Sequence, residues 1–241
     1  MKSNEAKVYW EHAGEISYAE AIYLHSDIEK HISTRLWQEG IKIGDQLGLN
    51  KQSNVLDLGC GDGTFANLIL SKHFGSVDGF DLSQAGIKRA RELATGLHTR
   101  FECCDITKID YTALPQYEAV YLWGILHHVK DAVPGILSKL HHVTKRIVVL
   151  EPNGNNIARK LLEYLPSYKA AGEESFRTKQ LESIFKQAGY SVMIWKRLNL
   201  FPNRTPKLLF HALRHVEPLI ERTPLLRALC TANMWGFIAD D

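Results

Sequence analysis

The pattern of apolar and polar residues changes once along the chain, near residue 54. Before that point apolar residues recur at helical spacing, and Ile28, Ile32, Leu36 and Ile43 would share one helical face. After it, short apolar runs end in glycine or aspartate and are followed by helical stretches, the alternation that is typical of a parallel sheet. The pattern therefore predicts helices over 16–49, followed by an α/β arrangement.

Seven strands and five helices are expected after residue 54. The expected strands cover 55–58, 77–80, 99–103, 119–123, 147–150, 191–197 and 233–239. The expected helices cover 64–70, 83–94, 132–140, 156–165 and 178–188. Ser83 is placed to cap the second of these helices, Pro166 to end the fourth and Gly189 to end the fifth. Helices that alternate with parallel strands form a right-handed βαβ series.

A segment punctuated by proline, 202–231, separates the last two expected strands. Its apolar residues Leu209, Leu213, Val216 and Ile220 recur at helical spacing, and basic residues lie among them. The segment is therefore amphipathic and mildly basic. Three interpretations stay open for it: a lid over an apolar ligand, a dimer face, and a helix that lies on a membrane surface.

Composition and charge narrow the class of protein. The 241 residues suit one α/β domain, and the net charge of +2, without a basic block, gives no support to nucleic-acid binding. The longest strongly apolar stretch, 119–126, is too short to span a bilayer, and the polar N-terminus does not resemble a signal peptide. Four cysteines without a Cys-x-x-Cys pair indicate reduced thiols. We expect a soluble, cytoplasmic protein.

The most specific motif is Val-Leu-Asp-Leu-Gly-Cys-Gly-Asp-Gly-Thr at 55–64, where an expected strand runs into a glycine-rich turn that opens a helix. Glycine lets the backbone approach a ligand closely. Dinucleotide enzymes seat a pyrophosphate on a Gly-x-Gly-x-x-Gly turn, but here Thr64 stands at the third glycine position. The charge of Asp57 beside the turn disfavours a pyrophosphate and suits the ammonium and sulfonium cations of S-adenosylmethionine.

Two further carboxylates follow expected strands. Asp81 comes 22 residues after Gly59, a spacing that suits a carboxylate accepting hydrogen bonds from two ribose hydroxyls. Asp105 follows the strand 99–103, where it can accept from an adenine amino group. The alternative for Asp81 is to cap the next helix, and for Asp105 to cap its own loop. Since ligands bind beyond the carboxyl ends of such strands, we expect both side chains at one site.

With these motifs, residues 50–197 resemble the class I S-adenosylmethionine-dependent methyltransferases, in particular the small-molecule type similar to the ubiquinone-biosynthesis group. The resemblance implies a Rossmann-like α/β fold with a mostly parallel seven-stranded sheet in the order 3-2-1-4-5-7-6, strand 7 antiparallel, and helices on both faces. It implies S-adenosylmethionine as the cofactor and S-adenosylhomocysteine as the product. The cofactor-binding residues that it implies are Asp57, Gly59, Cys60, Gly61, Asp81, Leu82, Cys104, Asp105, Ile106 and Trp123.

The same resemblance divides the chain into parts. Residues 1–241 would form a single methyltransferase domain, in which 1–50 is an N-terminal helical cap and 202–231 a helical insertion between strands 6 and 7. In the family, these are the regions that vary to form the substrate lid. The identity of the methyl acceptor therefore stays open.

His127 and His128 lie in a segment, 122–131, similar to the family's motif after the fourth strand, in which His128 matches the family's histidine. A histidine can take a proton from a hydroxyl or amine near neutral pH, so both are catalytic candidates, with His127 the leading candidate for a general base. The alternative is that they only hold the junction between strand and helix. No metal-ligand spacing is present, and we expect no metal.

The resulting prediction is an enzyme that transfers a methyl group from S-adenosylmethionine to an oxygen or nitrogen of a small, apolar or lipid-like metabolite. Alternatives are an RNA or protein acceptor, a catalytically inactive cofactor-binding partner subunit and, remotely, an NAD-dependent oxidoreductase. The expected partners are the small-molecule acceptor and a second copy of the chain in a homodimer. Peripheral contact with a membrane also fits the segment 202–231.

Overall fold

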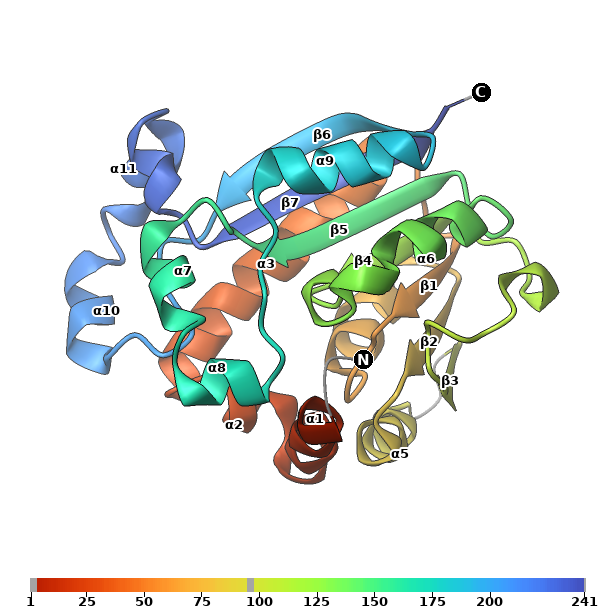
Figure 1. Cartoon of the computed structure of the whole chain (residues 1–241), viewed down its shortest axis with the longest axis horizontal. Helices are drawn as coiled ribbons and strands as arrows, with labels where there is room; N and C mark the ends of the chain where they lie inside the picture. Colours follow the sequence, from red (N-terminus) through yellow and green to blue (C-terminus); the bar gives the residue numbers. More distant parts are fainter. Residues whose placement is uncertain (1–3, 95–97, 241) are drawn as a thin grey trace.

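One seven-stranded sheet forms the centre of the molecule (Figure 1). The computed structural model describes residues 4–94 and 98–240, so the first three residues of the expected N-terminal cap lie outside the described part. The strand order is β3-β2-β1-β4-β5-β7-β6, and only β7 runs antiparallel to its neighbours. The strands are β1 (Asn54–Leu58), β2 (Ser76–Asp81), β3 (Thr99–Cys103), β4 (Ala119–Trp123), β5 (Arg146–Pro152), β6 (Tyr190–Leu198) and β7 (Ala232–Ala239). The expected fold is confirmed.

The central strands are apolar because the sheet is covered on both faces. In β4, Ala119 and Tyr121 belong to the core on one face of the sheet, and Val120 and Leu122 to the core on the other. All four side chains are fully buried. A parallel strand covered on both sides has no polar face, and this is why such strands are recognisable in the sequence as short apolar runs.

Helices cover the two faces of the sheet (Figure 1). α3 (Ser26–Gln46) packs on β5 and β7, and α9 (Thr178–Gln187) packs on β6 with α6 (Val133–Leu140) beside it. α5 (Gln84–Leu93) begins at Ser83, whose hydroxyl accepts from the Gly86 N–H as expected. The expected helix 64–70 is present but contains a π-helical stretch, η1 (Ala66–Leu70), that continues into α4 (Ser71–His73).

The chain after β5 departs from the expected single helix over 156–165. α7 (Ile157–Leu162) ends early, and Pro166 opens a separate helix, α8 (Pro166–Ala170). Proline lacks the N–H that a helix interior needs, but the first turn of a helix leaves that N–H unused. The residue that was expected to stop one helix therefore starts the next.

The segment 202–231 forms three short helices between β6 and β7: α10 (Lys207–Leu213), α11 (Glu217–Arg222) and η5 (Leu226–Leu229). Of the apolar residues at helical spacing, Leu209, Leu213 and Val216 are exposed. Phe210 and Glu217 are buried instead. Along the described chain, no helix combines the length and the apolar character needed to cross a membrane.

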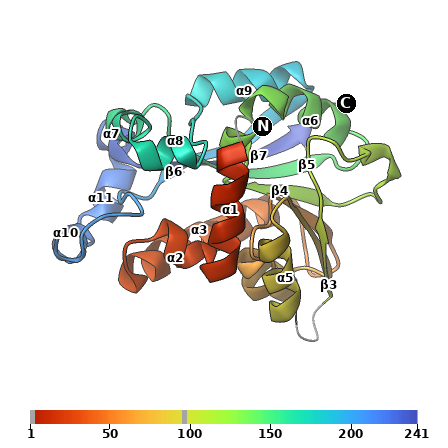
Figure 2. The same ribbon diagram turned by 60° about the horizontal axis from the view of Figure 1, so that its bottom comes forward.

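The N-terminal helices α1 (Asn4–Ile16) and α2 (Tyr18–Ile22) lie at the same end of the molecule as α8 (Figures 1 and 2). α1 packs on α5, where Gly14 leaves room for the backbone of Gly86. The Glu11 carboxylate accepts from the backbone N–H groups of Gln84 and Ala85 at 2.9 and 3.0 Å. A carboxylate at the start of a helix satisfies free N–H groups and complements the helix dipole, so Glu11 ties α1 to α5.

Candidate functional site

A cavity of about 410 Å³ lies beyond the carboxyl ends of the parallel strands, and residues that follow β1 to β5 line it. Ligands of open α/β sheets bind in this position. Nine of the ten residues expected to bind a cofactor line the cavity: Asp57, Gly59, Cys60, Gly61, Asp81, Leu82, Asp105, Ile106 and Trp123. Cys104 does not, because its half-buried side chain packs against the neighbouring core. Its place in the cofactor site stays a prediction.

The turn after β1 owes its shape to glycine. Gly59 and Gly61 have φ angles of +84° and +57°, values that residues with a side chain rarely adopt. The Gly61 N–H donates to Asp81 Oδ2 at 2.9 Å, and the Ser83 N–H donates to Asp81 Oδ1 at 2.8 Å. A Cβ atom on Gly61 would lie 2.5 Å from the Tyr18 ring, so α2 closes over this turn.

Asp57 presents a free carboxylate oxygen beside the turn. The side chain is 1% exposed, and Oδ1 has no hydrogen-bond partner among residues 4–94 and 98–240. Burial, with a smaller contribution from the charge of Asp81, raises the pKa of Asp57 to about 8. A buried acceptor without a partner is costly unless a ligand supplies one, so Asp57 suits a cationic or hydrogen-bond-donating group.

Asp105 both lines the cavity and caps its loop. Its Oδ1 accepts from the N–H and the hydroxyl of Thr107, at 3.0 and 2.6 Å, and Lys108 Nζ lies 3.1 Å from Oδ2. Burial works against the charged form, but the hydrogen bonds from Thr107 and Lys108 keep the pKa of Asp105 below its usual value. Trp123 stacks on Phe65 with ring centroids 4.2 Å apart, which makes it a fixed wall of the cavity.

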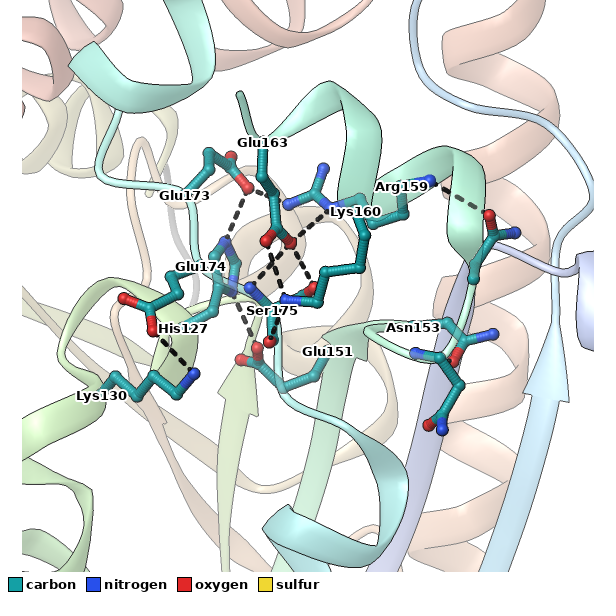
Figure 3. Close-up of polar contacts among 12 residues, drawn as sticks. His127, Lys130, Glu151, Asn153, Arg159, Lys160, Glu163, Glu173, Glu174 and Ser175 are labelled. Carbon is teal, nitrogen blue, oxygen red and sulfur yellow. Dashed lines mark hydrogen bonds and ion pairs between the residues drawn. The ribbon is translucent and has the colours of Figure 1, made fainter. Parts of the chain in front are cut away.

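His127 is clamped between two carboxylates (Figure 3). Its Nδ1 lies 2.8 Å from Glu151 Oε2, and its Nε2 lies 3.3 Å from Glu173 Oε2. Glu151 is fully buried at the end of β5, and its other oxygen accepts from the Leu126 N–H at 2.8 Å. Arg159 of α7 forms an ion pair with Glu173. The network joins three segments that are distant in sequence.

The carboxylates set the charge of His127. Burial favours the neutral ring, but Glu151 and Glu173 outweigh it and raise the pKa of His127 to about 9. Both ring nitrogens face carboxylates, so both carry hydrogen at neutral pH. A group that already holds its proton can act as a base only in its deprotonated fraction. The general-base role of His127 stays a prediction, and this charge state weighs against it at neutral pH.

His128 has the opposite charge state to His127, because its ring is uncharged. Burial and the neighbouring charge of His127 lower the pKa of His128 to about 3, so its ring is neutral. The Ala171 carbonyl is a hydrogen-bond partner of the ring, while Nδ1 is buried and has no partner within the described residues. Its ring packs against Trp10 of α1 at 5.0 Å between centroids. His128 therefore offers an open acceptor atom at the cavity wall.

His127, His128 and Glu173 also form a group that could hold a metal ion, because their ligand atoms lie within 4.8 Å of one another. Arg159 already neutralises Glu173, and Glu151 holds the Nδ1 side of His127 in its charged form. A metal requires neutral imidazoles and a free carboxylate. The residues fit an ion-pair network better than a metal centre, and metal-free chemistry stays a prediction.

The far end of the cavity is mostly apolar. Its walls come from α2, α3, α7 and α8, and the apolar and aromatic side chains there are Ile22, Tyr23, Ile32, Leu36, Trp37, Leu162 and Tyr168. Glu29 and Ser33 of α3 add polar groups to the lining, and another comes from Asn199, which follows β6. It is 3% exposed with φ at +64°, and its Oδ1 has no partner within the described residues. An unpaired buried acceptor that lines a cavity is available to a ligand.

Four residues of this site were missed by sequence reasoning: Tyr18, Arg159, Glu173 and Asn199. None of them lies in a motif that pointed to the site, and only the fold brings them there. Glu151 gave a signal, since it directly follows the apolar run of β5. A carboxylate at the carboxyl end of a parallel strand points to a site even without a motif.

Comparisons with known proteins agree with this geometry. A family model described as a methyltransferase domain matches residues 29–193. A putative sarcosine dimethylglycine methyltransferase from Galdieria sulphuraria has a similar structure, with 17% identity, a TM-score of 0.65, and coverage of 91% of this chain and 92% of that one. Magnesium protoporphyrin IX methyltransferase from Synechocystis, solved with bound S-adenosylhomocysteine, gives 15% identity, a TM-score of 0.59, and coverage of 90% and 89%.

A third similar structure, the [4+2]-cyclase SpnF, has 16% identity, a TM-score of 0.60, and coverage of 85% of this chain and 80% of that one. No curated protein sequence was found to match the chain. At these identities the likeness of the structures shows the fold. The match to the family model is stronger evidence than these structural similarities, because it rests on the sequence and spans most of the chain.

Proposed function

Because the chain belongs to the methyltransferase-domain family and is an S-adenosylmethionine-dependent enzyme of class I, we propose that its acceptor is a small, apolar or lipid-like metabolite methylated on oxygen or nitrogen. The apolar far end of the cavity carries this proposal, since it continues directly from the residues beside the glycine turn. Similar structures include enzymes named for different acceptors, so the choice rests on this chain's own side chains.

The residues around the turn fit the cofactor. Asp57, with its unpaired oxygen, and the Gly59-Cys60-Gly61 backbone would hold the methionine end. Asp81 and Leu82 would hold the ribose, and Asp105 and Ile106 the adenine, with Trp123 as a wall. The hydrogen bonds of Asp81 to two backbone N–H groups fix its carboxylate before any ligand arrives.

The bound cofactor supplies an activated methyl group on a sulfonium, so the protein's part is to position the acceptor and exclude water. Tyr18 and Trp10 line one side of the cavity with their rings in contact, so they would help to exclude water from it. His127 would keep the wall rigid through its two carboxylates. His128 Nδ1 would accept a hydrogen bond from the acceptor's O–H or N–H, and Asn199 Oδ1 would accept a second.

Calorimetric titration tests this proposal. The protein is titrated with S-adenosylmethionine and S-adenosylhomocysteine, with NAD as the control for a dinucleotide site. We expect both sulfur ligands to bind and NAD to give no heat. Methyl transfer is then screened with amphiphilic phenols, amines and fatty acids, against an RNA and a protein pool. Methylation of RNA or protein alone would overturn the small-molecule acceptor, and binding without any turnover would favour an inactive partner subunit.

Asp57 makes cofactor affinity depend on pH. With its pKa near 8, Asp57 is mostly protonated at neutral pH, and a cationic ligand binds the ionised form. The affinity for S-adenosylmethionine is therefore expected to rise between about pH 6 and about pH 8, by up to about tenfold per unit. Titration in buffers of different ionisation heat should detect the released proton. The Asp57→Asn variant should bind more weakly and lose the pH dependence; equal wild-type affinity at both ends of the range would contradict this role.

Asp81→Ala is expected to weaken S-adenosylmethionine binding by about 1 to 3 kcal/mol, because buried hydroxyls and two turn N–H groups lose a charged acceptor. Asp110→Ala is the matched control. Asp110 also caps a loop, through Thr112, but lies outside the cavity, so its variant should bind normally. Unchanged affinity in Asp81→Ala would remove Asp81 from the cofactor site.

A further inference from the structure

Exposed apolar side chains gather at one end of the molecule, where both views place α7, α10 and α11 (Figures 1 and 2). Leu208, Leu219 and Leu225 are 85%, 64% and 87% exposed. On α7, Ile157 and Leu161 are 79% and 65% exposed. Single exposed leucines are ordinary, but a group of this size on neighbouring short helices indicates a contact surface.

These leucines are exposed although the segment is firmly anchored. Phe210 packs into the core that contains α3, and Glu217, 1% exposed, forms an ion pair with Arg35 and lies 2.6 Å from His31 Nε2. Glu221 pairs with Arg35 at 2.7 Å. The segment thus turns an aromatic ring and two carboxylates inward and leaves its leucines outside. A helix that packs on its own core normally buries its leucines, so this orientation is the reverse of the usual one.

In the same segment, the acidic side chains face inward and the exposed charged side chains are basic. Glu217 and Glu221 are the only acidic residues of 202–231, all of which the structure describes, and both are turned toward α3. The exposed charged residues of the segment are all basic: Arg204, Lys207, Arg214 and Arg222. Asp27 neutralises Lys207 at 2.9 Å, whereas Arg214 and Arg222 make no ion pair with any described residue. The outer surface is therefore apolar and cationic.

From this surface we propose that the end formed by α7, α10 and α11 docks on lipid bilayers that carry anionic headgroups. Exposed leucines interleaved with arginines suit the boundary between acyl chains and anionic headgroups. A second copy of the chain is a less suitable partner for this surface. A two-fold interface would bring the same patch of both copies together, and Arg214 and Arg222 would then face a patch whose exposed charges are also basic.

The cavity runs toward this surface. Pro202 and Asn203, at the start of the segment, line the cavity, as does Leu162 of α7, which adjoins the exposed Leu161. A membrane-bound enzyme would thus receive an amphiphilic acceptor directly from the bilayer. This last step rests on the proposed function, whereas the docking surface does not.

Vesicle co-sedimentation tests the docking surface with the full chain. The probes are unilamellar vesicles of phosphatidylcholine alone and of phosphatidylcholine with about 30% phosphatidylglycerol. We expect binding to the anionic vesicles, at least about tenfold weaker binding to the neutral ones, and loss of binding as salt rises to about 0.5 M. The Leu208→Glu/Leu225→Glu variant should lose more than about tenfold in affinity while binding S-adenosylmethionine normally.

The matched control is Leu68→Glu/Met193→Glu, which makes the same charge change at residues that are 43% and 60% exposed on other elements, and it should bind vesicles as the wild type does. Absence of binding to anionic vesicles would overturn the proposal, and so would binding that Leu208→Glu/Leu225→Glu leaves unchanged. A dimer in sedimentation equilibrium that this variant dissociates, without vesicle binding, would assign the surface to self-association. If the variants bind S-adenosylmethionine normally, either result concerns the docking surface alone and leaves the methyltransferase assignment unchanged.

Discussion

Replacing Glu151 with alanine is expected to destabilise the folded protein by about 3 to 5 kcal/mol. Glu151 is fully buried, and its two oxygens accept from the Leu126 N–H and from His127 Nδ1, both at 2.8 Å. Without it, the charged ring of His127 loses a partner, and a buried N–H is left unsatisfied. Urea denaturation near neutral pH measures the loss. Arg100→Ala, which breaks an exposed ion pair with Asp78, should cost less than about 1 kcal/mol in the same experiment.

The pH dependence of stability gives a second measure of the same network. The pKa of His127 is raised in the folded protein to about 9, from an ordinary value near 6.5. The stabilisation that it contributes is complete below the ordinary pKa and is lost as pH rises through the folded value. Glu151→Gln should reduce this loss, so the difference in stability between wild type and variant should shrink from about pH 6 to about pH 9. A constant difference would show that His127 is not charged.

Gly59→Ala is expected to reduce S-adenosylmethionine affinity by about 100-fold or more, since the added methyl meets a wall of the cavity. The new Cβ would lie 2.5 Å from Cγ1 and 2.7 Å from Cβ of Ile125, which also lines the cavity. Ile125 cannot swing away at its Cβ, so the turn or the wall has to shift. Calorimetric titration with S-adenosylmethionine measures the effect.

Gly48→Ala separates this effect from backbone strain. Gly48 has φ at +86°, close to the +84° of Gly59, but nothing lies within 4 Å of its added Cβ. Both variants should lose a similar amount of stability from the left-handed backbone, about 1 to 3 kcal/mol. Only Gly59→Ala should also lose the cofactor. Equal affinities in the two variants would mean that the turn does not hold the ligand closely.

The residues proposed to bind the cofactor could be placed at the cavity from the sequence, because their positions depend on neighbours in sequence. Asp57, Gly59 and Gly61 lie at the end of one strand, and Asp81 ends the next. A buried parallel strand is a short apolar run, so its end is visible, and the polar residue at that end is visible with it. For β3 and β4 the expected and observed bounds coincide. Cys104 does not line the cavity, because the residue after a strand can turn its side chain toward the core.

The contacts in the part of the cavity proposed for the acceptor were not predictable, because they form across the fold. His127, Glu151 and Glu173 meet from three segments, and the charge of the histidine follows from that meeting alone. In the segment 202–231, periodicity predicted an amphipathic segment but not which side chains face the core. The anchors there are Phe210 and Glu217, and a buried glutamate is invisible to a hydrophobic pattern until its partner Arg35 is known.

The cover formed by α1 and α2 bears on how fast the enzyme can work. Trp10 and Tyr18 line the same cavity as Asp57 and Asp81, and Glu11 ties this cover to the first N–H groups of α5. Spent cofactor that leaves on this side has to displace both rings and break these hydrogen bonds. We therefore expect the steady-state rate to be limited by release of S-adenosylhomocysteine, which requires the N-terminal segment to open, and not by methyl transfer.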